Sequence, residues 1–126
     1  ADFAYMGTRF ISSKESLAKP EYKAMLVDSV AKDIINTAAF TGIPNNMLRQ
    51  SIEKAGFDPD NIPSSAKSKL NFDDPHSGAK AWRDIWSAGH GVGEVKEILS
   101  VKEIVASLTT QYQETLQKPI ITRRFI

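Results

Sequence analysis

The chain has 126 residues, of which 41% are hydrophobic and 25% are charged, a composition typical of a globular domain that excludes a disordered chain. Its 16 basic and 15 acidic residues leave a net charge of +1, so we expect no nucleic-acid partner. Cysteine is absent, which excludes disulfides, thiolate zinc sites and a cysteine nucleophile, and no apolar run approaches the ~20 residues of a membrane span.

The chain opens on an apolar segment. Phe3–Met6 contains no charged side chain, which is the pattern of a strand buried on both faces of a parallel sheet. Such a strand needs a neighbour on each side. We therefore expect further strands to be encoded ahead of Ala1.

A helix and an extended segment are predicted next. Pro20 and Glu21 are residue types favoured at the start of a helix, and apolar residues at helical spacing predict a helix over about 20–31. Residues 34–37 are expected to be extended. The stretch 40–44 contains Gly and Pro and is expected to be a turn.

The middle of the chain is predicted to hold two short helices separated by a long loop. Asn46 can cap a helix over roughly 47–55, which Gly56 would end. Residues 57–77 are predicted to be a loop, and a loop of that length is usually functional or wraps another surface. Residues 79–87 are predicted to form a helix with an aromatic face.

The last helix has the clearest signals. A Gly-containing break at 88–93 precedes it, and Ser100 and Glu103 form a capping box at its start. A sustained apolar stripe carries the helix to about residue 117. The tail at 120–126 is apolar and basic and is not assigned.

The strongest chemical signal is the pair Gly7-Thr8 after the predicted strand. Glycine lets the backbone come close to an anion, and the Thr8 amide and hydroxyl can both donate to phosphate oxygens. In (β/α)₈ barrels the phosphate site is often built from the loops after strands seven and eight. The alternative is an ordinary turn after a strand.

Two histidines invite a chemical interpretation. His90 could titrate near neutral pH, but it lies between two glycines, so the alternative is a loop histidine without chemistry. His76 follows Asp73 and Asp74, but these three residues lack the fixed ligand spacing of zinc sites. No metal site is expected.

The glycines and tryptophans near residue 90 have simple structural interpretations. Gly89, Gly91 and Gly93 do not match the dinucleotide fingerprint, and we expect them to let the backbone pass close to another segment. Trp82 and Trp86 lie four residues apart on one face of the predicted helix. They either pack against a barrel or line a substrate entrance.

Several short motifs, in consistent order from residue 1 to about 117, resemble the nitronate monooxygenase (2-nitropropane dioxygenase) family. The first ten residues resemble its last barrel strand, where a segment of the form Ala-Asp-Gly-Ala-x-Met-Gly-Thr-x-Phe holds the phosphate of flavin mononucleotide (FMN). The further matches are Glu21-Tyr22-Lys23, Phe40-Thr41-Gly42, Gly56-Phe57-Asp58-Pro59, Lys80-Ala81-Trp82 and Ala88-Gly89-x-Gly91-Val92-Gly93. The chain departs from the family at Phe3, where Gly is common, and at His90, where Gln is common.

The resemblance implies an α/β fold, the C-terminal fragment of a flavin-binding (β/α)₈ TIM barrel. Residues 1–12 would be the last barrel strand and phosphate-binding turn, and residues 13–126 the C-terminal helical region. The catalytic base that it implies is a His on an earlier barrel loop, so no catalytic residue is expected in this chain. The cofactor-binding residues that it implies are Tyr5, Met6, Gly7 and Thr8.

The implied activity is the FMN-dependent oxidation of alkyl nitronates with O₂, in the cytoplasm, to a carbonyl compound and nitrite. This segment would anchor the FMN phosphate. Two alternatives stay open. The parent could be another reductase on the same FMN barrel, such as an enoyl-acyl-carrier-protein reductase or an NADH:quinone reductase, or the fragment could have no activity of its own.

Overall fold

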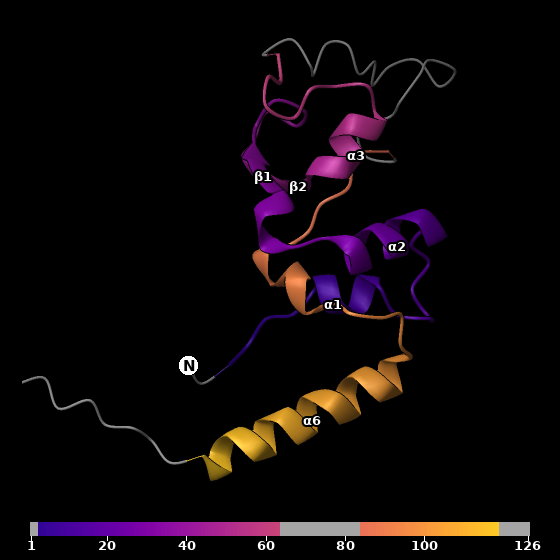
Figure 1. Cartoon of the computed structure of the whole chain (residues 1–126), viewed down its shortest axis with the longest axis vertical. Coiled ribbons are helices and arrows are strands. Elements are labelled where there is room, and N and C mark those ends of the chain that lie inside the picture. Colours follow the sequence, from indigo (N-terminus) through magenta and orange to yellow (C-terminus); the bar gives the residue numbers. More distant parts are fainter. Residues whose placement is uncertain (1–2, 64–83, 119–126) are drawn as a thin grey trace, which may run out of the picture.

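A hairpin and several short helices form a small body, and one long helix projects from it (Figure 1). The computed structural model describes residues 3–63 and 84–118. The mixture of helix and strand agrees with the predicted α/β class. In chain order the elements are α1 (Thr8–Ile11), α2 (Pro20–Asp28), the 3₁₀ helix η1 (Ala31–Asp33), β1 (Ile34–Thr37), β2 (Asn45–Leu48), α3 (Arg49–Lys54), the 3₁₀ helix η2 (His90–Glu94) and α6 (Val101–Gln117).

Helix α2 confirms the prediction of a helix that begins at Pro20. Proline suits the first helical turn because the amide it lacks would have no intrahelical acceptor there. The helix ends at Asp28 rather than near 31. At that end the Ser29 hydroxyl donates to the Met25 carbonyl over 2.6 Å, and the backbone becomes extended.

β1 and β2 form an antiparallel hairpin in which Ile34 lies opposite Leu48 and Thr37 opposite Asn45. The predicted extended segment at 34–37 is therefore confirmed. The connection between the strands contains Gly42 at a φ of 82°, a left-handed conformation that favours glycine. This confirms the predicted turn.

The helix predicted over roughly 47–55 is wrong at its first two residues and in its cap Asn46, because Asn45–Leu48 is strand β2 and α3 begins only at Arg49. Pairing of this segment on both of its edges outweighs its helical signals. The predicted end of the helix is confirmed. Gly56 has a φ of 85°, its amide donates to the Glu53 carbonyl, and the Phe57 amide donates to the Ile52 carbonyl, which is a Schellman motif.

The second edge of β2 pairs with residues 86–88. The Leu48 amide donates to the Trp86 carbonyl over 2.8 Å, and the Ala88 amide donates to the Asn46 carbonyl over 3.3 Å. The helix predicted over 79–87 is thus wrong at 85–87, because this stretch is recruited to the hairpin. Its first part, including Trp82, lies outside the described residues.

Two hydrophobic clusters lie on either side of β2, since successive side chains of a strand point to opposite faces. Met47 belongs to one cluster and Leu48 to the other. The members of the first are Phe40, Met47, Ile52 and Ile85, and those of the second are Leu26, Leu48, Trp86, Ala88, Val92 and Val95. Trp86 is 6% exposed within the second cluster, and its predicted packing against a barrel stays a prediction.

Helix α6 confirms the prediction in both extent and capping. Ile104 is its one buried residue among those described, so the rest of the helix extends past the small body (Figure 1). The apolar stripe predicted for this helix is real but largely uncovered in this chain. Val105, Tyr112 and Leu116 on the stripe are 49%, 63% and 63% exposed.

We expect the start of α6 to be sensitive to acid through Glu103. The Ser100 hydroxyl, the Ser100 amide and the Lys14 ammonium donate to the Glu103 carboxylate and lower its pKa from 4.5 to about 2. A carboxyl whose folded pKa is depressed stabilises the fold above its unfolded pKa, and this stabilisation disappears as the pH falls toward 2. Helicity followed by circular dichroism should therefore fall between about pH 4.5 and 2.

Glu103→Gln should already show reduced helicity at pH 7 and should have lost most of this pH dependence. Glu114→Gln, at the exposed far end of the same helix, is the matched control and should retain it. Identical acid curves for the two variants would contradict the role given to Glu103.

The N-terminal segment has neither helical nor strand structure at residues 3–7 and runs outward from α1 (Figure 1). Phe3 is 94% exposed. A strand exists only through hydrogen bonds to a neighbouring strand, and no described residue supplies them here. The last barrel strand therefore stays a prediction.

Candidate functional site

A cavity of about 600 Å³ lies between the N-terminal segment, the Gly-rich stretch that leads into η2, and one face of α6. It brings together parts of the chain that are far apart in sequence. Its lining residues are Ala4, Tyr5, Met6, Gly7, Thr8, Arg9, Gly89, Gly91, Glu94, Ile104, Ser107, Leu108 and Gln111.

All four residues predicted to bind a cofactor line this cavity: Tyr5, Met6, Gly7 and Thr8. Tyr5 is fully exposed and Met6 is about half exposed, so both present apolar surface that the chain itself does not cover. The cavity gathers these residues at one place. Their binding role stays a prediction.

A hydrogen bond joins the two conspicuous sequence motifs. The Gly89 amide donates to the Thr8 hydroxyl oxygen over 2.9 Å. A Cβ atom added to Gly89 would lie 3.6 Å from that oxygen, so the two segments are in close contact. The predicted close approach of the backbone to another segment is thus confirmed at Gly89, whereas a Cβ atom at Gly91 would meet no atom within 4 Å.

The start of α1 lines the cavity. The first amides of a helix have no acceptor within the helix. The Gly7 carbonyl caps the turn by accepting from the Phe10 and Ile11 amides over 2.9 and 3.2 Å. The Thr8 hydroxyl accepts from Gly89 and keeps its own hydrogen for donation.

Arg9 is a cavity residue that the sequence reasoning missed. Its guanidinium donates to the Glu97 carbonyl over 3.4 Å, and the side chain is partly buried. The signal that could have identified it is its place directly after Gly7-Thr8, since an arginine there adds a permanent positive charge beside the helix start. Glu94 opposes it with a negative charge in the same cavity.

Two glycines leave free space in the cavity wall. A Cβ atom added to Gly7 or to Gly91 would meet no other atom within 4 Å. Gly7 has a φ of −113°, which any residue can adopt. The backbone of this wall is thus open to close approach. Together with the first-turn amides, the Thr8 hydroxyl and Arg9, this arrangement fits a phosphate group.

The other predicted candidates do not enter this cavity. His90 is exposed and is not among its lining residues. His76, Asp73 and Asp74 lie outside the described residues. Within 3–63 and 84–118, no three His, Cys, Asp or Glu residues gather as metal ligands, and no helix is long and apolar enough to cross a membrane.

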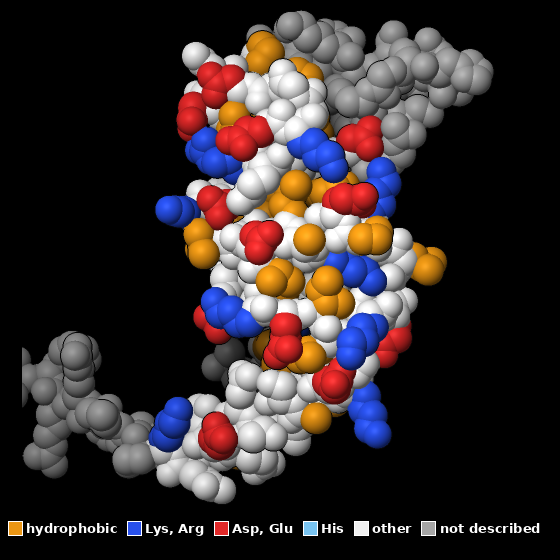
Figure 2. All heavy atoms as spheres, turned by 45° about the vertical axis from the view of Figure 1, so that its right-hand side comes forward, with side chains coloured by type: hydrophobic (Ala, Val, Ile, Leu, Met, Phe, Trp, Pro, Cys, Tyr) orange, Lys and Arg blue, Asp and Glu red, His pale blue; other side chains and the backbone are white. Residues whose placement is uncertain are grey.

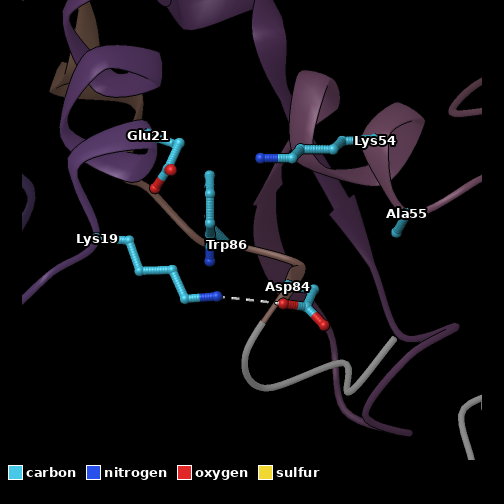
Figure 3. Close-up of a pocket in the computed structure, with 6 residues that line it drawn as sticks. All are labelled: Lys19, Glu21, Lys54, Ala55, Asp84 and Trp86. Atoms are coloured by element: carbon cyan, nitrogen blue, oxygen red, sulfur yellow. Dashed lines mark hydrogen bonds and ion pairs between the residues drawn. The ribbon is translucent and has the colours of Figure 1, made fainter. Parts of the chain in front are cut away.

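A second cavity, of about 520 Å³, lies over Trp86 and is lined also by Lys19, Glu21, Lys54, Ala55 and Asp84 (Figure 3). Lys19 forms an ion pair with Asp84 at 3.4 Å, and the Lys54 ammonium lies 5.3 Å from the centroid of the Trp86 ring. Two lysines and two acidic residues balance in charge. These contacts serve folding, so the first cavity is the better candidate site.

The surface around these cavities carries mixed charge. Figure 2 shows basic and acidic side chains interspersed over the visible face, with apolar side chains between them. Arg49 and Asp60 illustrate the pattern, because they form a two-pronged ion pair at 2.9 and 2.7 Å. The Arg49 guanidinium lowers the pKa of the exposed Asp60 carboxyl.

Comparison with known proteins places the chain in a family. The chain resembles two solved structures of FabK from Thermotoga maritima. One is 30% identical to this chain, with a TM-score of 0.63. The match covers 88% of this chain and 37% of the FabK chain. The other is a point mutant that is 21% identical, with a TM-score of 0.56, and the match covers 88% of this chain and 34% of the mutant chain. This second similarity concerns the fold alone.

The chain therefore spans about a third of the length of these FabK chains. No curated protein matches it. The family model described as "Nitronate monooxygenase" matches residues 1–111, which is most of the sequence. The chain belongs to the nitronate monooxygenase family.

Proposed function

We propose that this chain is the phosphate-anchoring part of an FMN-dependent nitronate monooxygenase. The observation that carries the proposal is the cavity in which the start of α1, the Thr8 hydroxyl and Arg9 face the open wall at Gly7 and Gly91. Family membership supports the same cofactor. When bound, the flavin would supply the redox chemistry by which alkyl nitronates and O₂ give a carbonyl compound and nitrite.

The roles of the residues follow from their chemistry. The amides of Gly7 and Thr8 and the Thr8 hydroxyl would donate to phosphoryl oxygens, and Arg9 would add charge. Tyr5 and Met6 would cover the less polar part of the ligand. The base and the substrate pocket would come from the remainder of a barrel, of which this chain matches 37% in FabK.

The test compares FMN with riboflavin, which lacks the phosphate, on the ¹⁵N-labelled 126-residue chain. We expect FMN and inorganic phosphate to shift the amide signals of Gly7, Thr8, Arg9 and Gly89, with affinity of roughly millimolar because few contacts are available. Riboflavin should shift them far less. Equal responses to both flavins, or shifts centred on the Trp86 cavity, would contradict phosphate anchoring.

A second candidate is another reductase on the same FMN barrel, of the enoyl-acyl-carrier-protein reductase or NADH:quinone reductase type. One observation favours it: the solved structures that resemble the chain bear the name FabK rather than that of a nitronate monooxygenase. Both candidates use the same phosphate anchor. Assays of the complete enzyme would separate them, since O₂ consumption with a nitronate supports the first, and NADH oxidation coupled to reduction of an enoyl thioester or a quinone supports the second.

A further inference from the structure

Lys23 is a buried cation on α2 whose partners are all backbone carbonyls. Lys23 is buried, with 9% of its surface exposed. The ammonium donates to the carbonyls of Ser13 at 2.6 Å, Ser16 at 2.8 Å and Lys14 at 3.4 Å. Among the described residues no carboxylate pairs with it. An ammonium has three N–H donors, and burying it is costly unless each donor has an acceptor. Here the acceptors are the three carbonyls of the loop 13–16.

The loop held by Lys23 is bonded to the end of α1. The Ser13 amide donates to the Phe10 carbonyl over 3.1 Å. The Ser12 hydroxyl, just before the loop, donates to the Arg9 carbonyl over 2.9 Å. Fixing the carbonyls of the loop therefore also fixes the orientation of the short helix that carries Thr8 and Arg9.

The same loop is bonded to the start of α6. The Lys14 amide donates to the Leu99 carbonyl over 2.8 Å. The Glu15 carboxylate accepts from the Val101 amide, with its two oxygens at 3.0 and 2.9 Å. The loop thus connects two elements that both line the candidate cavity.

We infer that Lys23 is the positioning residue that sets the separation of α1 and α6, and through it the fit of the cavity to phosphate. The part of the inference that concerns phosphate rests on the proposed function. The effect of Lys23 on α1 and α6 can be measured without any ligand. Lys23 itself does not line the cavity. Its removal should therefore change affinity indirectly, by releasing the loop.

The experiment uses Lys23→Met, which keeps the length of the side chain and removes its donors. Amide hydrogen exchange at Lys14 should accelerate by about tenfold or more, because three hydrogen bonds to a charged group are lost. The FMN response at Thr8 and Arg9 should weaken by about threefold or more, a fraction of the loss expected for a direct contact. Exchange at Leu48, in the hairpin, should be unchanged.

Two control variants separate positioning from general destabilisation. Lys32→Met makes the same chemical change at an exposed lysine, and Ile52→Val weakens the core on the far side of β2. Neither should accelerate exchange at Lys14 selectively. If Lys23→Met does not fold, Lys23→Arg supplies the measurement. Its donors lie in one plane instead of the tripod of an ammonium, so they match the three carbonyls less well and the same changes should appear in smaller degree.

The outcomes are distinct. Unchanged exchange at Lys14 in the Lys23 variant would overturn the inference. Faster exchange with unaltered FMN affinity would overturn the link from the loop to the cavity. If the unmodified chain shows no phosphate-specific response at all, the proposed function fails, and the exchange data alone still decide whether Lys23 holds the two elements.

Discussion

Replacing Gly7 by Ala is expected to abolish most of the response of the chain to FMN while leaving its stability nearly unchanged. The backbone at Gly7 has a φ of −113°, and a Cβ atom there would meet nothing within 4 Å, so alanine fits without strain. That methyl group would, however, occupy the space through which a phosphate approaches the amides. Loss of hydrogen bonds to a charged group should weaken binding by about tenfold or more.

The matched control for this prediction is Gly56→Ala, which should have the opposite effect. Gly56 has a φ of 85° at the end of α3 and does not line the cavity. Alanine in that left-handed conformation should lower the free energy of unfolding by about 1 kcal/mol and leave the FMN response intact. The two measurements are thermal unfolding and FMN titration. A Gly7 variant that binds FMN normally would remove the case for close phosphate approach.

Replacing Leu48 by Ala is expected to cause a large loss of stability. Leu48 is fully buried in the second cluster, and its amide joins β2 to residue 86. Truncating a buried leucine removes transfer free energy and leaves a cavity, which typically costs about 2–5 kcal/mol. A loss of this size would unfold a substantial fraction of a marginally stable chain.

Leu116→Ala is the matched substitution on the exposed stripe of α6. Leu116 is 63% exposed, so its truncation should change the free energy of unfolding by less than about 0.5 kcal/mol. Urea unfolding followed by circular dichroism compares the two variants. Equal losses would mean that α6 packs against the body more closely than its exposure indicates.

Local sequence signals predicted the helices well wherever a capping signal and an apolar pattern agreed. Pro20 at the start of α2, the Ser100–Glu103 box of α6 and Gly56 at the end of α3 are examples. Each depends on contacts within a few residues. Such contacts can be inferred from spacing alone, which is why these boundaries were close to those observed.

The errors came from pairing between distant segments. Asn46 and Trp86 both carry helical signals in sequence, but the Asn46 carbonyl accepts from the Ala88 amide and the Trp86 carbonyl from the Leu48 amide, far away along the chain. No local pattern reports which segment will lie on the other edge of β2. The same holds for Lys23, because its positioning role depends on hydrogen bonds to three carbonyls of the loop 13–16.

The candidate site was predictable in part for a related reason. Gly7-Thr8 has a chemical signature of its own, whereas the contribution of Arg9 and of the α6 face depends on how the chain brings them together. The sequence predicted a close approach at Gly89, which is confirmed, but it did not indicate that Thr8 would be the partner.

The pairing of β2 with residues 86–88 brings together the two ends of the chain segment between Leu48 and Trp86. The entropic cost of bringing two ends together grows only with the logarithm of the segment's length, so doubling the length costs about 0.6 kcal/mol. Relatives could therefore lengthen or shorten the chain between these two residues at little thermodynamic cost. Variation in length across the family should accumulate there, whereas the short path from Thr8 to Lys23 leaves no such freedom.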